Sequence, residues 1–162
     1  MRIAVDAMGG DYAPREVVSG AVKAARELPN ITDLFLVGDE SAIKAELARC
    51  GTVPDSIKIR HASQVVEMGE APALAVRRKR DSSIGRAVDM VKAGEADAVM
   101  SAGNTGAVVA AATLKLRTLE GVDRPAIAAV MPTRGAHPLV LVDAGANIDC
   151  EPRMLGQFAA MG

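Results

Sequence analysis

The stretch that decides the fold is Ala98-Val99-Met100-Ser101-Ala102-Gly103-Asn104-Thr105-Gly106-Ala107. Three apolar residues precede a small, polar corner with two glycines, and a run of helix-forming residues follows it. This order is typical of a buried strand that passes into a helix through a tight turn, where a ligand can approach the backbone. Asn104 is a preferred residue type at a helix N-cap, and the hydroxyls of Ser101 and Thr105 can donate and accept hydrogen bonds. We interpret the corner as an anion-facing turn at the carboxyl end of a central strand.

Strands and helices alternate on both sides of this stretch. Several predicted strands are apolar throughout, which is typical of a parallel sheet covered on both faces. We therefore predict an α/β fold, a three-layer αβα sandwich with a mostly parallel sheet, in one domain over residues 1–162. The predicted strands are residues 2–5, 34–37, 56–60, 98–100, 125–131 and 139–142, and the predicted helices begin near Pro14, Asp39, Ser82, Asn104 and Glu151.

Two expectations concern less regular parts of the chain. Residues 65–81 show no clear periodicity, so we expect an irregular connection there, and we expect the helix after Asn104 to fade near Gly121. The last predicted helix is still in progress at Gly162, which indicates the front part of a longer chain.

Composition narrows the function classes. Hydrophobic residues make up 49% of the 162 residues and charged ones 24%, as in a soluble globular protein. Aromatic residues are only 2% and the net charge is −1, which argues against a nucleic-acid partner. The two cysteines and two histidines have no metal-ligand spacing, so we expect no metal. An early carboxylate at Asp6 excludes a signal peptide, and residues 106–114 are too short to span a bilayer, so we expect a cytoplasmic protein.

Three predicted strands end in similar small, polar corners, at residues 6–11, 101–106 and 143–147. In a parallel sheet these corners lie on the carboxyl edge, where helix N-termini present free N–H groups that suit phosphate. A shared ligand site is the functional interpretation, and three ordinary glycine turns are the alternative. Neither Gly-x-Gly-x-x-Gly after the first strand nor a P-loop motif is present, so a nucleotide site is poorly supported.

Most of the polar residues allow two roles. Asp6 and Asp143 can brace their loops or act as general bases, and bracing is the more common role beside a glycine turn. Asn104 and Asn147 can cap a helix or a turn, or donate to a developing oxyanion. The basic run of residues 77–80 is either a solvated helix face or a site for phosphate and an acidic partner.

Four motifs, taken in order, resemble the bacterial phosphate acyltransferase family, also called acyl-acyl-carrier-protein:phosphate acyltransferase. The resemblance spans the whole chain and about the first half of the family's usual length. The motifs are Asp6-Ala7-Met8-Gly9-Gly10-Asp11 with Ala13-Pro14, Arg77-x-Lys79-x-x-Ser82-Ser83, Ser101-Ala102-Gly103-Asn104-Thr105-Gly106-Ala107, and Asp143-x-Gly145-Ala146-Asn147-x-Asp149-Cys150.

The resemblance implies that inorganic phosphate attacks the thioester of a fatty acyl chain on acyl carrier protein and releases acyl phosphate for phospholipid synthesis. It also implies a phosphotransacetylase-like (Rossmann-like) fold, a homodimer, no metal or nucleotide cofactor, and peripheral contact with the inner face of the membrane. Two alternatives stay open. One is a short-chain phosphotransacetylase that uses acyl-coenzyme A, and the other is a non-catalytic α/β ligand-binding or dimerisation module.

The residue chemistry and these motif positions together suggest roles. We expect Lys79 and Asn104 to be catalytic, and Arg78 and Arg80 to face the acidic carrier protein. Substrate binding is expected from the remaining polar and glycine positions of the motifs, namely Asp6, Gly9, Gly10, Asp11, Arg77, Ser82, Ser83, Ser101, Gly103, Thr105, Asp143, Gly145 and Asn147.

Overall fold

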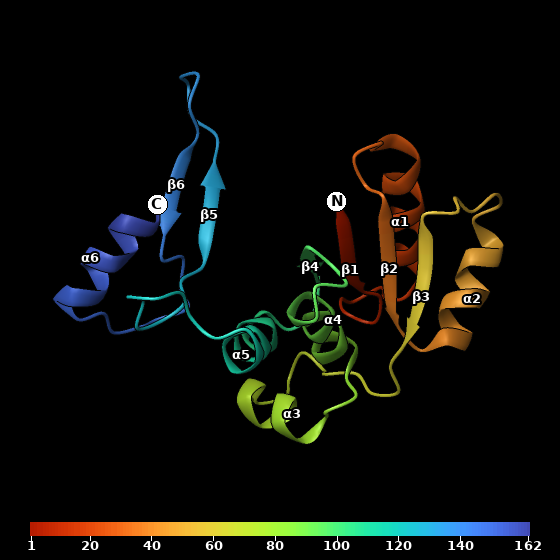
Figure 1. Cartoon of the computed structure of the whole chain (residues 1–162), viewed down its shortest axis with the longest axis horizontal. Coiled ribbons are helices and arrows are strands. Elements are labelled where there is room, and N and C mark those ends of the chain that lie inside the picture. Colours follow the sequence, from red (N-terminus) through yellow and green to blue (C-terminus); the bar gives the residue numbers. More distant parts are fainter. The chain divides into compact units, whose positions relative to one another are not determined.

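The computed structural model describes all residues, 1–162, and they form two compact units, Met1–Leu116 and Arg117–Gly162 (Figure 1). The first unit contains the α/β sandwich, and the second contains a β-hairpin and a helix. The parallel sheet belongs to the first unit alone. The single domain expected over residues 1–162 stays a prediction.

A four-stranded parallel sheet forms the centre of the first unit. Its strands lie in the order β3-β2-β1-β4, and β1 pairs with both β2 and β4. The mostly parallel sheet of the predicted α/β fold is therefore confirmed. The strands are β1 (Arg2–Asp6), β2 (Asp33–Gly38), β3 (Ile57–His61) and β4 (Ala98–Met100).

Helices cover both faces of this sheet, since alternate strand residues point to opposite sides. Val5 and Leu36 pack with Val18 of one helix and Ile43 of another. On the other face, Ala4 and Val37 pack with Ala87 and Met90. The three layers predicted from the apolar strands are thus present. The helices on the first face are α1 (Arg15–Glu27) and α2 (Glu40–Arg49), and α4 (Ser83–Lys92) lies on the second face.

The winding of the chain reverses beside β1. The chain passes from β1 through β2 to β3 in one direction, and then crosses back to place β4 on the other side of β1. The connecting helices change face at the same point. In open α/β sheets, ligands bind at the carboxyl ends of the strands where the winding reverses. The carboxyl ends of β1 and β4 are therefore the place to look for a site.

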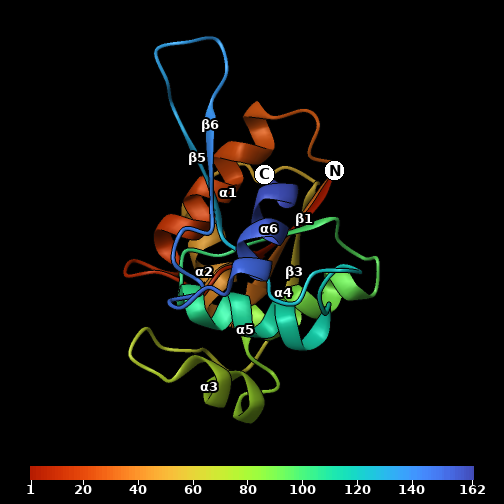
Figure 2. The same ribbon diagram turned by 90° about the vertical axis from the view of Figure 1, so that its left-hand side faces the viewer.

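Two further helices complete the first unit, α3 (Pro72–Arg78) and α5 (Thr105–Lys115), and they lie side by side in Figures 1 and 2. The irregular connection expected over residues 65–81 is wrong in part, because it contains α3. The helix α3 has seven residues and buries only Ala75 and Val76. Two buried positions are too few for a helical periodicity to be visible in the sequence. The helix α5 ends at Lys115 rather than near Gly121.

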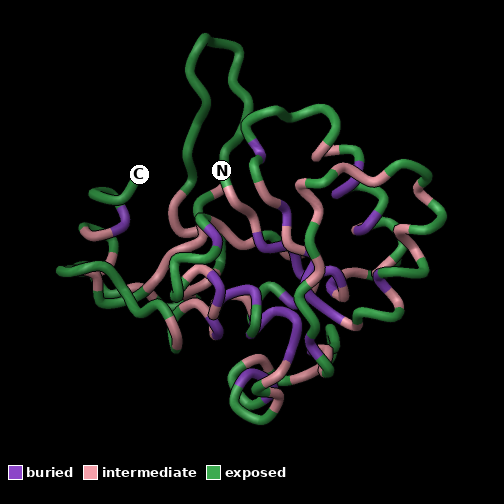
Figure 3. Tube along the Cα trace, turned by 45° about the vertical axis from the view of Figure 1, so that its right-hand side comes forward, coloured by how far each residue is buried: buried purple, intermediate pink, exposed green.

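The second unit contains an antiparallel pair, β5 (Ala128–Met131) and β6 (Leu139–Val142), followed by α6 (Pro152–Met161). Parallel strands need a crossover of about a dozen residues, and the turn over residues 132–138 is too short for one. The placement of residues 143–147 on the carboxyl edge of a parallel sheet is therefore wrong. The largely exposed hairpin contrasts with β1 and β2 of the first unit, whose inner residues are buried (Figure 3).

Candidate functional site

The carboxyl ends of β1 and β4 are joined by a side-chain hydrogen bond. Ser101 donates through Oγ to Oδ2 of Asp6 over 2.8 Å, although the two residues are 95 positions apart. The Asp6 carboxylate is buried, 2% exposed, and its Oδ1 accepts from the backbone N–H of Met8 over 3.2 Å. Ser101 Oγ accepts in turn from the N–H of Gly103 over 3.1 Å. Two of the three predicted corners thus meet at the point where the winding reverses.

Gly9 and Gly103 allow this close approach. A Cβ on Gly9 would lie 2.5 Å from Oδ2 of Asp6 and 2.9 Å from both Ser101 Oγ and the Gly103 nitrogen. A Cβ on Gly103 would lie 3.0 Å from the Cα of Gly9. Gly9 therefore has no room for a side chain and Gly103 has little, because two backbone segments pass each other there. Gly10 needs glycine for another reason, a φ of +115°, and the neighbouring Asp11 is exposed with no side-chain hydrogen bond.

Asn104 connects the corner to residues 65–70, which we name the 65–70 segment. Its Oδ1 caps α5 by accepting from the N–H of Ala107 over 3.0 Å. Its Nδ2 lies 3.2–3.3 Å from the carbonyl oxygens of Glu67, Met68 and Glu70. The side chain is 7% exposed. The amide therefore caps the helix and holds the segment, whereas donation to an oxyanion stays a prediction.

Lys79 holds the same segment from the other side. Its Nζ donates to the carbonyl of Val65 over 2.6 Å and to Oε2 of Glu70. The hydrogen bond from Lys79 holds the pKa of Glu70 below its usual value, and a bond from the Glu67 N–H acts in the same direction. Lys79 and Asn104, the two residues predicted to be catalytic, thus both contact Glu70. Sequence reasoning missed Glu70, which stands in the stretch that showed no periodicity.

The structure places four further motif residues, of which Ser82, Ser83 and Thr105 are predicted to bind substrate. Ser82 caps α4 by accepting from the N–H of Gly85 over 3.3 Å, and both Ser82 and Ser83 are buried. Gly106 makes room for a protein side chain, because a Cβ there would lie 2.6 Å from Cγ of Pro72. Thr105 is exposed in the first turn of α5, where backbone N–H groups have no partner within the helix.

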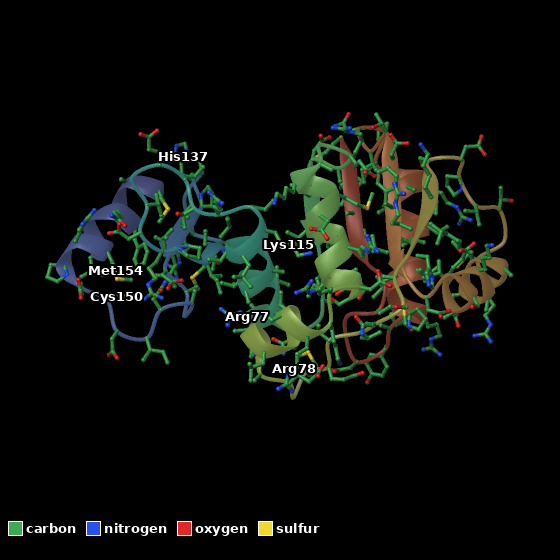
Figure 4. The ribbon with its side chains drawn as sticks, turned by 60° about the horizontal axis from the view of Figure 1, so that its bottom comes forward. Arg77, Arg78, Lys115, His137, Cys150 and Met154 are labelled. Carbon is green, nitrogen blue, oxygen red and sulfur yellow. The ribbon has the colours of Figure 1, made fainter.

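The basic run divides between two sides of α3. Arg77 and Arg80 line a depression of about 540 Å³ together with Lys115 and Asp89. Lys115 is held there by Asp89 over 2.6 Å and by the Gly85 carbonyl over 3.1 Å. Arg78 is exposed, and Figure 4 shows it on another side of α3 from Arg77. The two cations that share a surface are therefore Arg77 and Arg80, whereas the sequence suggested Arg78 and Arg80.

The third corner, residues 143–147, lies in the second unit, and its aspartate is hydrogen-bonded only to residues of that unit. Oδ1 of Asp143 accepts from the N–H groups of Ile127 and Ala146 over 2.8 and 3.1 Å. Oδ2 accepts from the backbone N–H and Nδ2 of Asn147 over 2.7 and 2.9 Å. Burial alone would raise the pKa of Asp143, but these hydrogen bonds outweigh it and lower the pKa. Asp143 therefore braces its own loop, and Gly145 supplies a φ of +103° there.

No three His, Cys, Asp or Glu side chains gather in a way that could hold a metal ion. No helix has both the length and the apolar character needed to cross a bilayer.

Known proteins resemble the chain along its whole length. The model of a family described as "Fatty acid synthesis protein" matches residues 1–162. Proteins named phosphate acyltransferase from Geobacter sulfurreducens and Pelotomaculum thermopropionicum are 54% and 52% identical over 100% of this chain and 46% of their own lengths. The chain spans about half the length of these curated relatives.

A solved structure has the same fold. A phosphotransacetylase from Streptococcus pyogenes superposes with a TM-score of 0.72 at 20% identity, over 98% of this chain and 51% of that one. The phosphotransacetylase-like fold expected from the motifs is therefore confirmed. Because the family model matches every residue, the chain belongs to the fatty acid synthesis protein family, and its relatives are named phosphate acyltransferase.

Proposed function

We propose that the full-length protein transfers a fatty acyl group from acyl carrier protein to inorganic phosphate and so provides acyl phosphate for phospholipid synthesis. The observation that carries this proposal is the junction of Asp6, Ser101 and Gly103 at the carboxyl ends of β1 and β4. The names of relatives about half identical to this chain support an acyl donor and phosphate as substrates.

The reaction needs position and charge stabilisation rather than a protein nucleophile. A phosphate oxygen attacks the thioester carbonyl carbon, a C–O bond forms, and the carbonyl oxygen becomes an oxyanion. The carbonyl then re-forms as the C–S bond breaks, and the departing carrier thiolate takes up the proton that hydrogen phosphate gives up on attack. Neutral N–H donors held in fixed positions stabilise such an oxyanion, since they need no reorganisation during the reaction.

The residues of the corner divide into donors and supports. The N–H groups of Thr105 and Gly106, which the Asn104 cap does not use, and the exposed Thr105 hydroxyl are the proposed anion donors. Both carboxylate oxygens of Asp6 already accept hydrogen bonds, from the Met8 N–H and the Ser101 hydroxyl, so Asp6 orients Ser101 rather than binding phosphate. Lys79 contributes its charge to phosphate by exchanging its contact with Glu70, and Asn104 keeps the 65–70 segment beside the corner.

Acyl carrier protein is the proposed partner of the depression between α3 and α5. Arg77 and Arg80 are exposed there and have no acidic side chain paired with them, while Lys115 is neutralised by Asp89. Opposite charge across an interface raises the association rate, and salt screens this effect. The homodimer and the contact with the inner face of the membrane remain proposals that rest on the family resemblance.

Assay of the full-length protein with phosphate and different acyl donors tests this function. We expect acyl phosphate, trapped as the hydroxamate, from palmitoyl-acyl carrier protein at a much higher rate than from acetyl-coenzyme A. The opposite preference would favour the short-chain phosphotransacetylase. The absence of product and of free thiol with every donor would favour the non-catalytic module.

Two variants test the residue roles in the same assay. Lys79→Ala and Asn104→Ala should each lower kcat/KM at least about tenfold, because each loses a contact worth about 1.4 kcal/mol or more. Lys92→Ala, which changes an exposed lysine at the end of α4, is the matched control. Unchanged rates in both site variants would show that the roles are assigned wrongly.

A further inference from the structure

An apolar groove begins at the Asp6–Ser101 junction and runs along α1. Asp6, Ser101 and Ala102 line one end, and Leu28 and Ile31 line the other. The groove has a volume of about 460 Å³, within the range of about 300–1,000 Å³ that is usual for small-molecule sites. It is therefore continuous with the proposed reaction site and large enough for a ligand.

Aliphatic side chains form almost all of the groove. Val17, Ala21 and Ala24 contribute from α1, and Ile3 and Val5 contribute from β1. Asp6, Ser101 and Glu16 are the only polar side chains that line it, and all three come from its end at the carboxyl edge. A ligand that fits this pattern is polar at one end and hydrocarbon along the rest of its length.

Small residues keep the groove open. Gly20 lies in the middle of its α1 wall, and a Cβ built there meets no atom within 4 Å. Leu28 and Met100 remain 52% and 60% exposed although both are large and apolar. Apolar surface left uncovered beside a polar junction is typical of a binding site.

We propose that this groove binds the aliphatic chain of the acyl substrate, with the thioester at the Asp6–Ser101 junction and the chain directed along α1 toward Leu28. This inference rests on the proposed function, because it takes the substrate to be a long-chain acyl thioester. The α1 wall from Val17 to Leu28 rises roughly 16 Å. Each methylene that binds there removes apolar surface from water, which corresponds to about a fourfold gain in affinity.

The variant Gly20→Leu of the full-length protein tests the assignment. The added side chain enters open space in the groove, so it shortens the groove without displacing a protein atom. We expect kcat/KM for palmitoyl-acyl carrier protein to fall at least about tenfold, as expected when two or more methylenes lose their site. The value for hexanoyl-acyl carrier protein should change less than about twofold on the same reasoning.

The matched control is Gly156→Leu, since Gly156 also stands inside a helix with no atom within 4 Å of a built Cβ. It makes the same change of residue type outside the groove and should leave the ratio of the two rates unchanged. An unaltered ratio in Gly20→Leu, or an equal loss for both chain lengths, would overturn the assignment.

A labelling experiment gives a readout independent of turnover. Palmitoyl-acyl carrier protein with a diazirine at the end of the alkyl chain is photolysed with the full-length protein, and labelled peptides are mapped by mass spectrometry. Label in residues 17–31, which Gly20→Leu abolishes, supports the groove, and label confined to other segments overturns it. If no acyl phosphate forms in the activity assay, the proposed function fails, and the labelled position still decides the groove.

Discussion

The corners that follow β1 and β6 look alike in sequence but differ in what their carboxylates contact. Each places an aspartate directly after an apolar strand and a glycine two or three residues later. Asp143 accepts all four of its hydrogen bonds from residues beside its own hairpin, namely Ile127 just before β5 and Ala146 and Asn147 in the loop after β6. Asp6 accepts one from its own loop and one from Ser101, which follows a different strand, β4.

The sheet topology explains this difference. A hairpin brings together residues close in sequence, so Asp143 meets only its own neighbours. The parallel order β2-β1-β4 instead brings together strand ends distant in sequence, and Asp6 can be shared with β4. An aspartate–glycine corner therefore indicates a braced loop in general, and it joins a wider site only where parallel strands end beside it.

The largest expected difference between the corners is at their glycines. In the full-length protein, Gly9→Ala should lower the free energy of unfolding by about 2–3 kcal/mol, because its Cβ overlaps the Asp6 carboxylate and the Gly103 backbone. Gly145→Ala meets no atom within 4 Å and should cost about 1 kcal/mol, from its positive φ alone. Urea unfolding measures both, and equal costs would show that the two strand ends do not pack as described.

Their asparagines should differ less. Asn104→Ala removes a helix cap and the contacts to three carbonyl groups, so we expect a loss of about 2 kcal/mol and faster amide hydrogen exchange in the 65–70 segment. Asn147→Ala removes side-chain contacts to Asp143 and the Pro125 carbonyl, and about 1 kcal/mol should be lost. Unchanged exchange in Asn104→Ala would contradict its role as the tether of that segment.

Acid should reveal how strongly Asp143 is braced. Its pKa is lowered in the folded protein, so its contribution to stability is present above the unfolded pKa of about 3.9 and is lost as the pH falls toward the folded value. Asp143→Asn should therefore show a shallower loss of stability than the unaltered protein below about pH 4. Asp149→Asn makes the same charge change at an exposed position and should keep the original slope.

The smallest effect is expected at the outer carboxylates of the two corners. Asp11 and Asp149 are both exposed and have no side-chain hydrogen bond. Asp11→Asn and Asp149→Asn should each change the free energy of unfolding by less than about 0.5 kcal/mol. A larger cost at Asp11, with normal behaviour at Asp149, would reveal a partner for the first loop in the full-length protein.

The sequence predicts the parallel sheet well because its signals are local. Apolar runs mark β1, β2 and β4, and the capping residues Asp39, Ser82 and Asn104 stand where three helices begin. The prediction that residues 98–100 form a buried central strand is wrong, because β4 lies at the edge of the sheet and has no buried residue. The length of the turn over residues 132–138 is an equally local indication of an antiparallel pair, which the prediction did not use. A turn of that length is too short for the crossover between parallel strands. Helix α3 gave no local signal, since so short a helix buries few residues.

Contacts within the site are harder to predict because they depend on partners distant in sequence. The motifs indicate that Lys79 and Asn104 are capable of catalysis, but neither residue type nor spacing reveals that Glu70 contacts both. In the same way, Ser82 and Ser83 match a phosphate-binding pattern, and only the structure shows that both are buried and that Ser82 caps α4. Residue types show what a side chain can do, whereas packing decides which of its hydrogen bonds are already used.

The hydrogen bond between Asp6 and Ser101 also has a consequence for how the chain is assembled. During synthesis β1 emerges first, yet Ser101, the hydrogen-bond partner of the Asp6 carboxylate, follows 95 residues later. Closing so long a loop is slow compared with forming a hairpin, because few conformations bring such distant residues together. A nascent chain that has not yet added β4 leaves one carboxylate oxygen of Asp6 without Ser101 and Gly9 without the Gly103 backbone. The Asp6–Ser101 junction therefore forms only when β4 is in place beside β1.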